Sequence, residues 1–146
     1  MRRVSSDADA LIDRLGLRPH PEGGWYAETW RADAGVDGRA TSTGIYFLLR
    51  AGERSHWHTC DGDEIWVFHD GDPLELSCSP DGATVQRTVL GVDLAAGQRP
   101  QIVVPAGQWQ AAASQGSWTL VSCVVAPGFE FEGFVLAPPG WEPGEG

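Results

Sequence analysis

Residues 55–72 read SHWHTCDGDEIWVFHDGD and gather three of the chain's four histidines within one short stretch. His56 and His58 are two residues apart, so in a β-strand their side chains are predicted to point to the same face. The segment TCDGD predicts a turn, and Glu64 then begins a returning strand, where it can face both histidines. The stretch therefore predicts a β-hairpin with two imidazoles and a carboxyl group on one side.

The inner face of the second strand continues from Glu64 through Trp66 and Phe68. The two aromatic rings are candidates for a flat wall against a sugar or a nucleobase ring. His69 is five positions from Glu64, so we expect it to face the opposite way, outside the candidate site.

Short runs of β-branched and aromatic residues, separated by glycine and proline turns, fill most of the remaining chain. They predict strands near residues 24–31, 42–50, 54–59, 63–69, 73–78, 83–91, 100–104, 108–114, 117–126 and 129–137. One helix is expected near residues 6–16, and the tail over 138–146 is expected to be loose, since it has little to bury. Closely spaced short strands in 146 residues predict a single all-β domain, either a sandwich or a barrel.

The chain has a formal charge of −10, and all ten of its basic residues are arginines. Such a surface repels phosphate backbones and anionic lipids, so neither nucleic acid nor a membrane is an expected partner. The lack of lysine excludes Schiff-base enzymes and phosphate loops of the Walker type. Arginines can still form a local anion pocket, for which Arg31, Arg50 and Arg54 are the candidates, with solvated surface charges as the alternative.

The compartment is predicted from the cysteines and the N-terminus. The three cysteines are widely spaced and form no C-x-x-C motif, which is typical of reduced thiols. The first residues lack the apolar run of a signal peptide, and no stretch approaches the ~20 apolar residues of a membrane span. We therefore expect a cytoplasmic protein.

The stretch PHPEGG (residues 19–24) contains two prolines and two glycines, which predict a fixed turn leading into a strand. The functional alternative is that Glu22, Thr29 and Arg31 join a ligand pocket. Thr29 and Arg31 are two residues apart, so strand alternation predicts that they act on the same face.

Two stretches resemble the paired motifs of the cupin superfamily. The first motif is represented by Gly52, His56, His58, Glu64 and Gly71, and the second by Gly97, Pro105 and Gly107. In metal-binding cupins three histidines and one glutamate are ligands, and the last histidine belongs where Gln110 stands here. The gap between His58 and Glu64 is also one residue longer than usual.

Further segments are similar to one branch, the fifth cupin subfamily, a domain family of unknown function. The similarity spans residues 10–137 and rests on PHPEGGWYAETWR, STGIYFLL, DEIWVFH and PQIVVPAGQWQAA. It implies a double-stranded β-helix, or jelly-roll barrel, over residues 24–137, with a short N-terminal helix and a homodimeric assembly. It also implies kinship with plant storage proteins and with epimerases of keto-sugar nucleotides. A glutamine at position 110 is normal for this subfamily.

Three functions remain open. In the first, His56 or His58 moves a proton and Glu64 orients that histidine, while Gln110 binds a carbohydrate-like or sugar-nucleotide ligand, as in an isomerase or epimerase. In the second, an oxygenase or isomerase holds one divalent transition metal through His56, His58, Glu64 and Gln110. In the third, the cavity binds a small molecule without catalysis, as in storage proteins.

Overall fold

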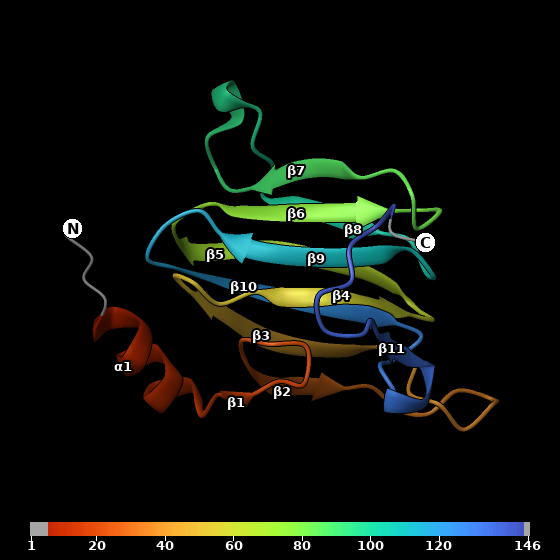
Figure 1. Cartoon of the computed structure of the whole chain (residues 1–146). Coiled ribbons are helices and arrows are strands. Elements are labelled where there is room, and N and C mark those ends of the chain that lie inside the picture. The colour runs from red at the N-terminus through yellow and green to blue at the C-terminus, as the bar shows by residue number, and fades with distance from the viewer. Residues whose placement is uncertain (1–5, 145–146) are drawn as a thin grey trace.

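The computed structural model describes residues 6–144 and places two antiparallel β-sheets face to face (Figure 1). One sheet has the strand order β1-β2-β3-β10-β5-β8 and the other β11-β4-β9-β6-β7. The strands are β1 (Arg18–Pro19), β2 (Trp25–Arg31), β3 (Thr43–Arg50), β4 (Ser55–Cys60), β5 (Asp63–Gly71), β6 (Leu74–Ser79), β7 (Gln86–Leu90), β8 (Gln101–Val104), β9 (Trp109–Ser114), β10 (Trp118–Ala126) and β11 (Phe134–Leu136). The predicted all-β jelly roll is confirmed.

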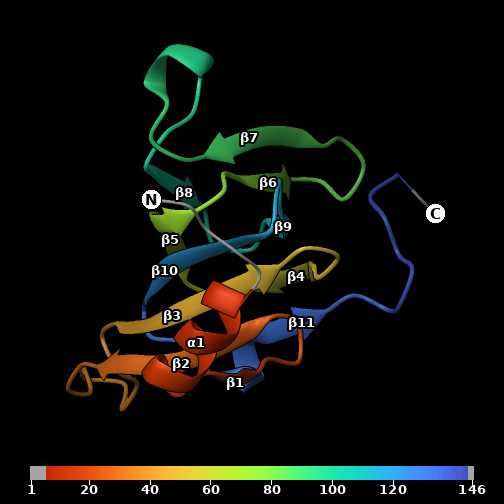
Figure 2. The same ribbon diagram turned by 90° about the vertical axis from the view of Figure 1, so that its left-hand side faces the viewer.

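The α-helix α1 (Ser6–Leu15) lies against the outer face of the six-stranded sheet (Figure 2). Its Ala8 packs with Leu48 and Trp118, both of which are buried. Gly16 ends the helix with a φ of 65°, a left-handed conformation that glycine adopts without a steric penalty. The short 3-10 helices η1 (Leu94–Ala96) and η2 (Phe131–Gly133) lie in connecting segments. Within residues 6–144, no helix combines the length and apolar character needed to span a bilayer.

The core fills one end of the space between the sheets and leaves a cavity at the other. Along the inner face of β3, Leu49 and Phe47 belong to the core, whereas Ile45 and Thr43 line the cavity. Period-two alternation along a single strand therefore supplies both the packing and the site.

The C-terminal segment packs against the five-stranded sheet. The Trp141 ring lies 6.2 Å from that of Trp57, centroid to centroid. Glu142 Oε2 accepts a hydrogen bond of 2.7 Å from the indole N–H of Trp57. The expectation of a loose tail is therefore wrong for residues 138–144, because these aromatic and charged side chains do find partners; residues 145–146 lie outside the described part.

Candidate functional site

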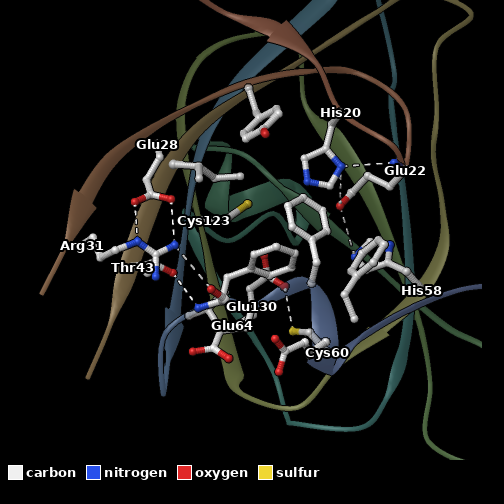
Figure 3. A pocket seen from close by; sticks show the side chains of 17 residues that line it. His20, Glu22, Glu28, Arg31, Thr43, His58, Cys60, Glu64, Cys123 and Glu130 are labelled. Carbon is white, nitrogen blue, oxygen red and sulfur yellow. Dashed lines mark hydrogen bonds and ion pairs between the residues drawn. The ribbon is translucent and has the colours of Figure 1, made fainter. Parts of the chain in front are cut away.

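A cavity of about 450 Å³ lies between the sheets (Figure 3). Of the residues predicted to form a site, four line it: Glu22, Arg31, His58 and Glu64. Thirteen further residues complete its lining: His20, Tyr26, Glu28, Thr43, Ile45, Cys60, Cys123, Val125, Phe129, Glu130, Phe131, Glu132 and Phe134. The cavity therefore has a polar inner end, an aromatic wall and a charged rim.

A β-bulge in β4 decides which of the two neighbouring histidines reaches the cavity. Ser55 pairs with Ala112 and His58 pairs with Gln110, so β4 contains one more residue than β9 over this step. His58 lines the cavity, whereas Nε2 of His56 contacts a backbone carbonyl of the C-terminal segment at 2.9 Å. The predicted common face of His56 and His58 is therefore wrong.

A second bulge, in β2, decides which residues of that strand reach the rim of the cavity. Between Glu28 and Trp30, β2 contains Thr29 as an extra residue relative to β3. Arg31 consequently lines the cavity together with Glu28. The Thr29 hydroxyl donates to the carbonyl oxygen of Gly44 at 3.2 Å, so its predicted partnership with Arg31 in the pocket is wrong.

Glu22 lies between two histidine rings at the inner end of the cavity (Figure 3). Its Oε1 atom is 3.4 Å from Nδ1 of His20 and 3.6 Å from Nε2 of His58. Its Oε2 atom accepts a hydrogen bond from the hydroxyl of Ser55. Two imidazole rings therefore approach one oxygen atom of the carboxyl group, and a hydroxyl group contacts the other.

Backbone contacts indicate which nitrogen of each neutral ring lacks a proton. Nδ1 of His58 lies 2.7 Å from the carbonyl oxygen of His56, so it donates and leaves a lone pair on Nε2. The backbone N–H of Glu22 donates to Nδ1 of His20 at 3.1 Å, so that nitrogen is also an acceptor. Because both ring atoms that face Oε1 carry lone pairs, a proton on Glu22 is favoured.

Burial sets the protonation of the same three groups. It raises the pKa of Glu22 to about 8, against the opposing effect of the hydrogen bond from Ser55. It lowers the pKa of His20 to about 4, with a further lowering by His58, and it also lowers the pKa of His58. Near neutral pH the carboxyl group is therefore protonated and both rings are neutral.

His20 is a site residue that the sequence reasoning missed, although it stands two positions before Glu22 in PHPEGG. Gly23 follows with a φ of 109°, and a Cβ atom there would lie 2.0 Å from the carbonyl oxygen of Arg54. Only glycine fits this close approach of two backbones. The turn that the prolines and glycines predicted thus also brings His20 and Glu22 into the cavity.

Glu64 and Gln110 form a second buried unit. Nε2 of Gln110 donates to Oε1 of Glu64 at 2.9 Å, and its own Oε1 accepts from the indole N–H of Trp66 at 2.9 Å. Burial raises the pKa of Glu64, opposed by the nearby His58. Gln110 does not line the cavity, so it positions the Glu64 carboxyl group instead of contacting a ligand.

The aromatic wall comes from a different segment than predicted. Trp66 and Phe68 pack in the core between the sheets and do not line the cavity. The wall is formed by Phe129, Phe131 and Phe134, whose rings pack edge to face with centroid distances of 5.0, 5.6 and 6.1 Å. Phe131 begins η2, and Phe129 and Phe134 lie on either side of it, in a segment where the sequence predicted only a continuous strand.

The four residues predicted to hold a metal do not converge. His56 lies outside the cavity, and both ends of the Gln110 amide are hydrogen bonded to protein groups. Within residues 6–144, no three His, Cys, Asp or Glu side chains are arranged as a metal-holding group. The donor set therefore does not fit a four-ligand centre, because one imidazole and the amide are already used elsewhere.

The two thiols that line the cavity stay protonated, and the arginines considered as anion-binding candidates are paired with carboxylates. Burial raises the pKa of Cys60 to about 12 and that of Cys123 well above its ordinary value, so neither is a thiolate at neutral pH. Arg31 donates to both carboxylate oxygens of Glu28, at 2.8 and 3.0 Å. Arg50 and Arg54 are also paired with carboxylates and do not line the cavity.

Comparisons with known proteins agree with this architecture. The family model described as "Cupin superfamily (DUF985)" matches residues 9–137. A solved structure from Shewanella oneidensis is 44% identical, with a TM-score of 0.84, covering 89% of this chain and 84% of that one. A hypothetical protein from Leishmania major is 33% identical, with a TM-score of 0.82, covering 92% and 89% of the two chains.

More distant structures share the fold alone. Oxalate decarboxylase from Bacillus subtilis is 10% identical, with a TM-score of 0.60, and the match covers 81% of this chain and 29% of that one. No protein with a curated description matches the chain. Shared fold does not imply shared chemistry.

Proposed function

We propose that this chain, which belongs to the Cupin_5 (DUF985) family of the cupin superfamily, binds a small carbohydrate-like molecule in its cavity. Side chains of the cavity then move a proton next to the carbonyl group of that molecule. The observation that carries this proposal is the contact of Glu22 with His20 and His58 at the inner end of the cavity. A protonated carboxyl group beside a neutral imidazole supplies an acid and a base at the same pH.

The reaction class is isomerisation or epimerisation through an enediol. Nε2 of His58 takes the proton from the carbon next to the carbonyl, and the electron pair of that C–H bond forms the new C=C bond. The carbonyl oxygen meanwhile takes the proton of Glu22, whose carboxylate accepts the hydrogen bond from Ser55. Return of a proton to carbon, with the hydroxyl proton going back to Glu22, yields the isomer or epimer.

The dimensions and charges of the cavity favour a ligand of monosaccharide size. A volume of about 450 Å³ is at the small end of ligand pockets. The phenylalanine rings offer an apolar surface to one face of a sugar. Among the described residues that line the cavity, Arg31 is the only arginine, and it is already bound to Glu28. It is therefore not free to bind the diphosphate of a sugar nucleotide, so we favour a sugar without a nucleotide.

The test is exchange of carbon-bound hydrogen in D₂O, followed by proton NMR with dihydroxyacetone, D-fructose and L-sorbose. The native protein is expected to accelerate exchange next to the carbonyl. Glu22→Gln and His58→Gln are each expected to lower that rate by about 100-fold or more, as for loss of a general acid or base. Saturation-transfer NMR should show that both variants still bind the sugar.

The outcomes separate catalysis from binding. Exchange that is equally fast in the variants would overturn the roles of Glu22 and His58. Sugar binding by the native protein without any exchange would overturn the catalytic half of the proposal and favour the non-catalytic cavity. Absence of binding for all three probes would overturn the carbohydrate-like ligand class.

A further inference from the structure

The rim of the cavity carries more negative than positive charge. Glu28, Glu130 and Glu132 line it, against the single cation of Arg31. Arg31 and Glu28 neutralise each other through two hydrogen bonds. Glu130 acts on Arg31 only at a distance, and neither it nor Glu132 forms an ion pair in the part of the chain that the structure describes.

An aromatic ring lines the same rim as these two carboxylates. Phe131 lies between Glu130 and Glu132 in the sequence, and its side chain is 57% exposed. Phe129 and Phe134 pack against it at 5.0 and 6.1 Å, centroid to centroid, and so hold the ring in place. A ring face attracts a cation through its quadrupole and a carboxylate does so through its charge, so the combination suits an ammonium group.

The rest of the cavity disfavours an anion. The ionisable groups at its inner end are two carboxyl groups, two neutral imidazoles and two thiols, none of which supplies a positive charge near neutral pH. A phosphorylated or acidic sugar would have to leave water without gaining a cation as partner. The formal charge of −10 over the whole chain attracts cations in the same sense.

We propose that the ligand is an amino sugar or a similar small amine, held with its ammonium group at Glu130 and Glu132 and its carbonyl end at Glu22 and His58. This inference rests on the proposed function, because it uses the same carbonyl end. The two ends of the ligand are recognised by groups of different character, one charged and partly or fully exposed and the other neutral and buried. The charge on the ligand thus determines its orientation in the cavity.

D-Glucosamine, D-glucose and D-glucuronate test this directly, since they share one ring and differ in charge. Binding is measured by titration NMR at pH 6.5 and low salt, with EDTA present to remove metal ions. Glucosamine is expected to bind roughly five- to tenfold more tightly than glucose, and glucuronate more weakly than glucose. Raising the salt to about 0.5 M should remove most of this difference, because screening acts on exposed charges.

Matched variants assign the effect to the rim. Glu130→Gln combined with Glu132→Gln should lower the affinity for glucosamine to about that for glucose. Asp13→Asn, which removes a negative charge from α1 outside the cavity, should leave the preference unchanged. The salt titration of the native protein provides a second measure that needs no variant.

The outcomes distinguish this inference from the proposed function. Equal affinity for glucosamine, glucose and glucuronate would overturn the ammonium site and leave the proton-transfer proposal standing. A preference for glucosamine that survives the rim substitutions would also overturn it. Binding of glucosamine without exchange in any keto sugar would instead retain the ammonium site and overturn the reaction.

Discussion

Nε2 of His58 directs its lone pair at the carboxyl group of Glu22 across 3.6 Å, and the two residues come from β4 and from the turn before β2. Burial favours the neutral form of both groups, which raises the pKa of the carboxyl group and lowers that of the imidazole. One proton therefore stays with the pair near neutral pH.

We expect the protein to lose stability as the pH rises from 6.5 to 8. Glu22 has a pKa raised from 4.5 to about 8, so in this window the folded state binds more protons than the unfolded state. One such group lowers the free energy of unfolding by about 1.4 kcal/mol per pH unit, or about 2 kcal/mol over the window. Glu64, with its raised pKa, acts in the same direction.

Urea unfolding at a series of pH values measures this slope. His20 and His58 act in the opposite sense, mainly below the ordinary histidine pKa of 6.5, since burial lowers the pKa of both rings. Glu22→Gln should flatten the slope between pH 6.5 and 8, whereas Glu132→Gln, at an exposed rim carboxyl group, should retain it. A native protein whose stability stays constant or rises through the window would contradict the buried, protonated Glu22.

Substitutions of His56 and His58 are expected to differ in their effect on the exchange of the sugar's carbon-bound hydrogen in D₂O. His58→Gln should lower the rate about 100-fold, because it removes the base that faces Glu22. His56→Gln should lie within about threefold of the native rate, since its ring lies outside the cavity and only the backbone carbonyl at this position contacts His58. Equal losses in both variants would mean that the bulge in β4 does not separate their roles.

Gln110→Leu is expected to destabilise the fold by roughly 2–4 kcal/mol. The substitution leaves the buried indole N–H of Trp66 and the carboxyl group of Glu64 without their 2.9 Å partners, each at a cost of about 1–3 kcal/mol. Combining it with Trp66→Phe should cost about 1 kcal/mol less than the sum of the two single substitutions, because both remove the same hydrogen bond. Gln101→Leu, at an exposed position of β8, is the control and should change stability by less than about 0.5 kcal/mol. Additive effects of Gln110→Leu and Trp66→Phe would contradict the role of Gln110 as a hydrogen-bonded bridge between Trp66 and Glu64.

Two glycines with left-handed backbones provide a further comparison. Gly23→Ala places a Cβ atom 2.0 Å from a backbone oxygen, whereas Gly52→Ala, at a φ of 80°, meets no atom within 4 Å. We expect a loss of about 1 kcal/mol for Gly52→Ala, from conformation alone, and more than about 3 kcal/mol for Gly23→Ala. Thermal unfolding measures both. Gly23→Ala should also slow the exchange of the sugar's carbon-bound hydrogen, since it displaces Glu22. Equal stability losses in the two variants would show that the turn tolerates a side chain.

Local residue patterns predicted the strands well. The strand expected near 42–50 is β3 (Thr43–Arg50), and the helix expected near 6–16 is α1 (Ser6–Leu15). Alternating apolar residues and turn residues act over a few positions, so each segment carries its own signal. Glu22, His58 and Glu64 were found in the same way, because strand alternation and an unusual turn singled them out.

Strand pairing decided which side chains belong to the site. Alternation within one strand predicted His56 beside His58 and Thr29 beside Arg31, and a bulge in each strand reverses these expectations. A bulge depends on the register of the neighbouring strand, which comes from a distant part of the sequence. The sequence by itself therefore determined the all-β class of the fold and four of the residues that line its cavity. Only the tertiary structure decided which side chains meet in the cavity, and burial there, which no single strand can produce, makes Glu22 an acid at neutral pH.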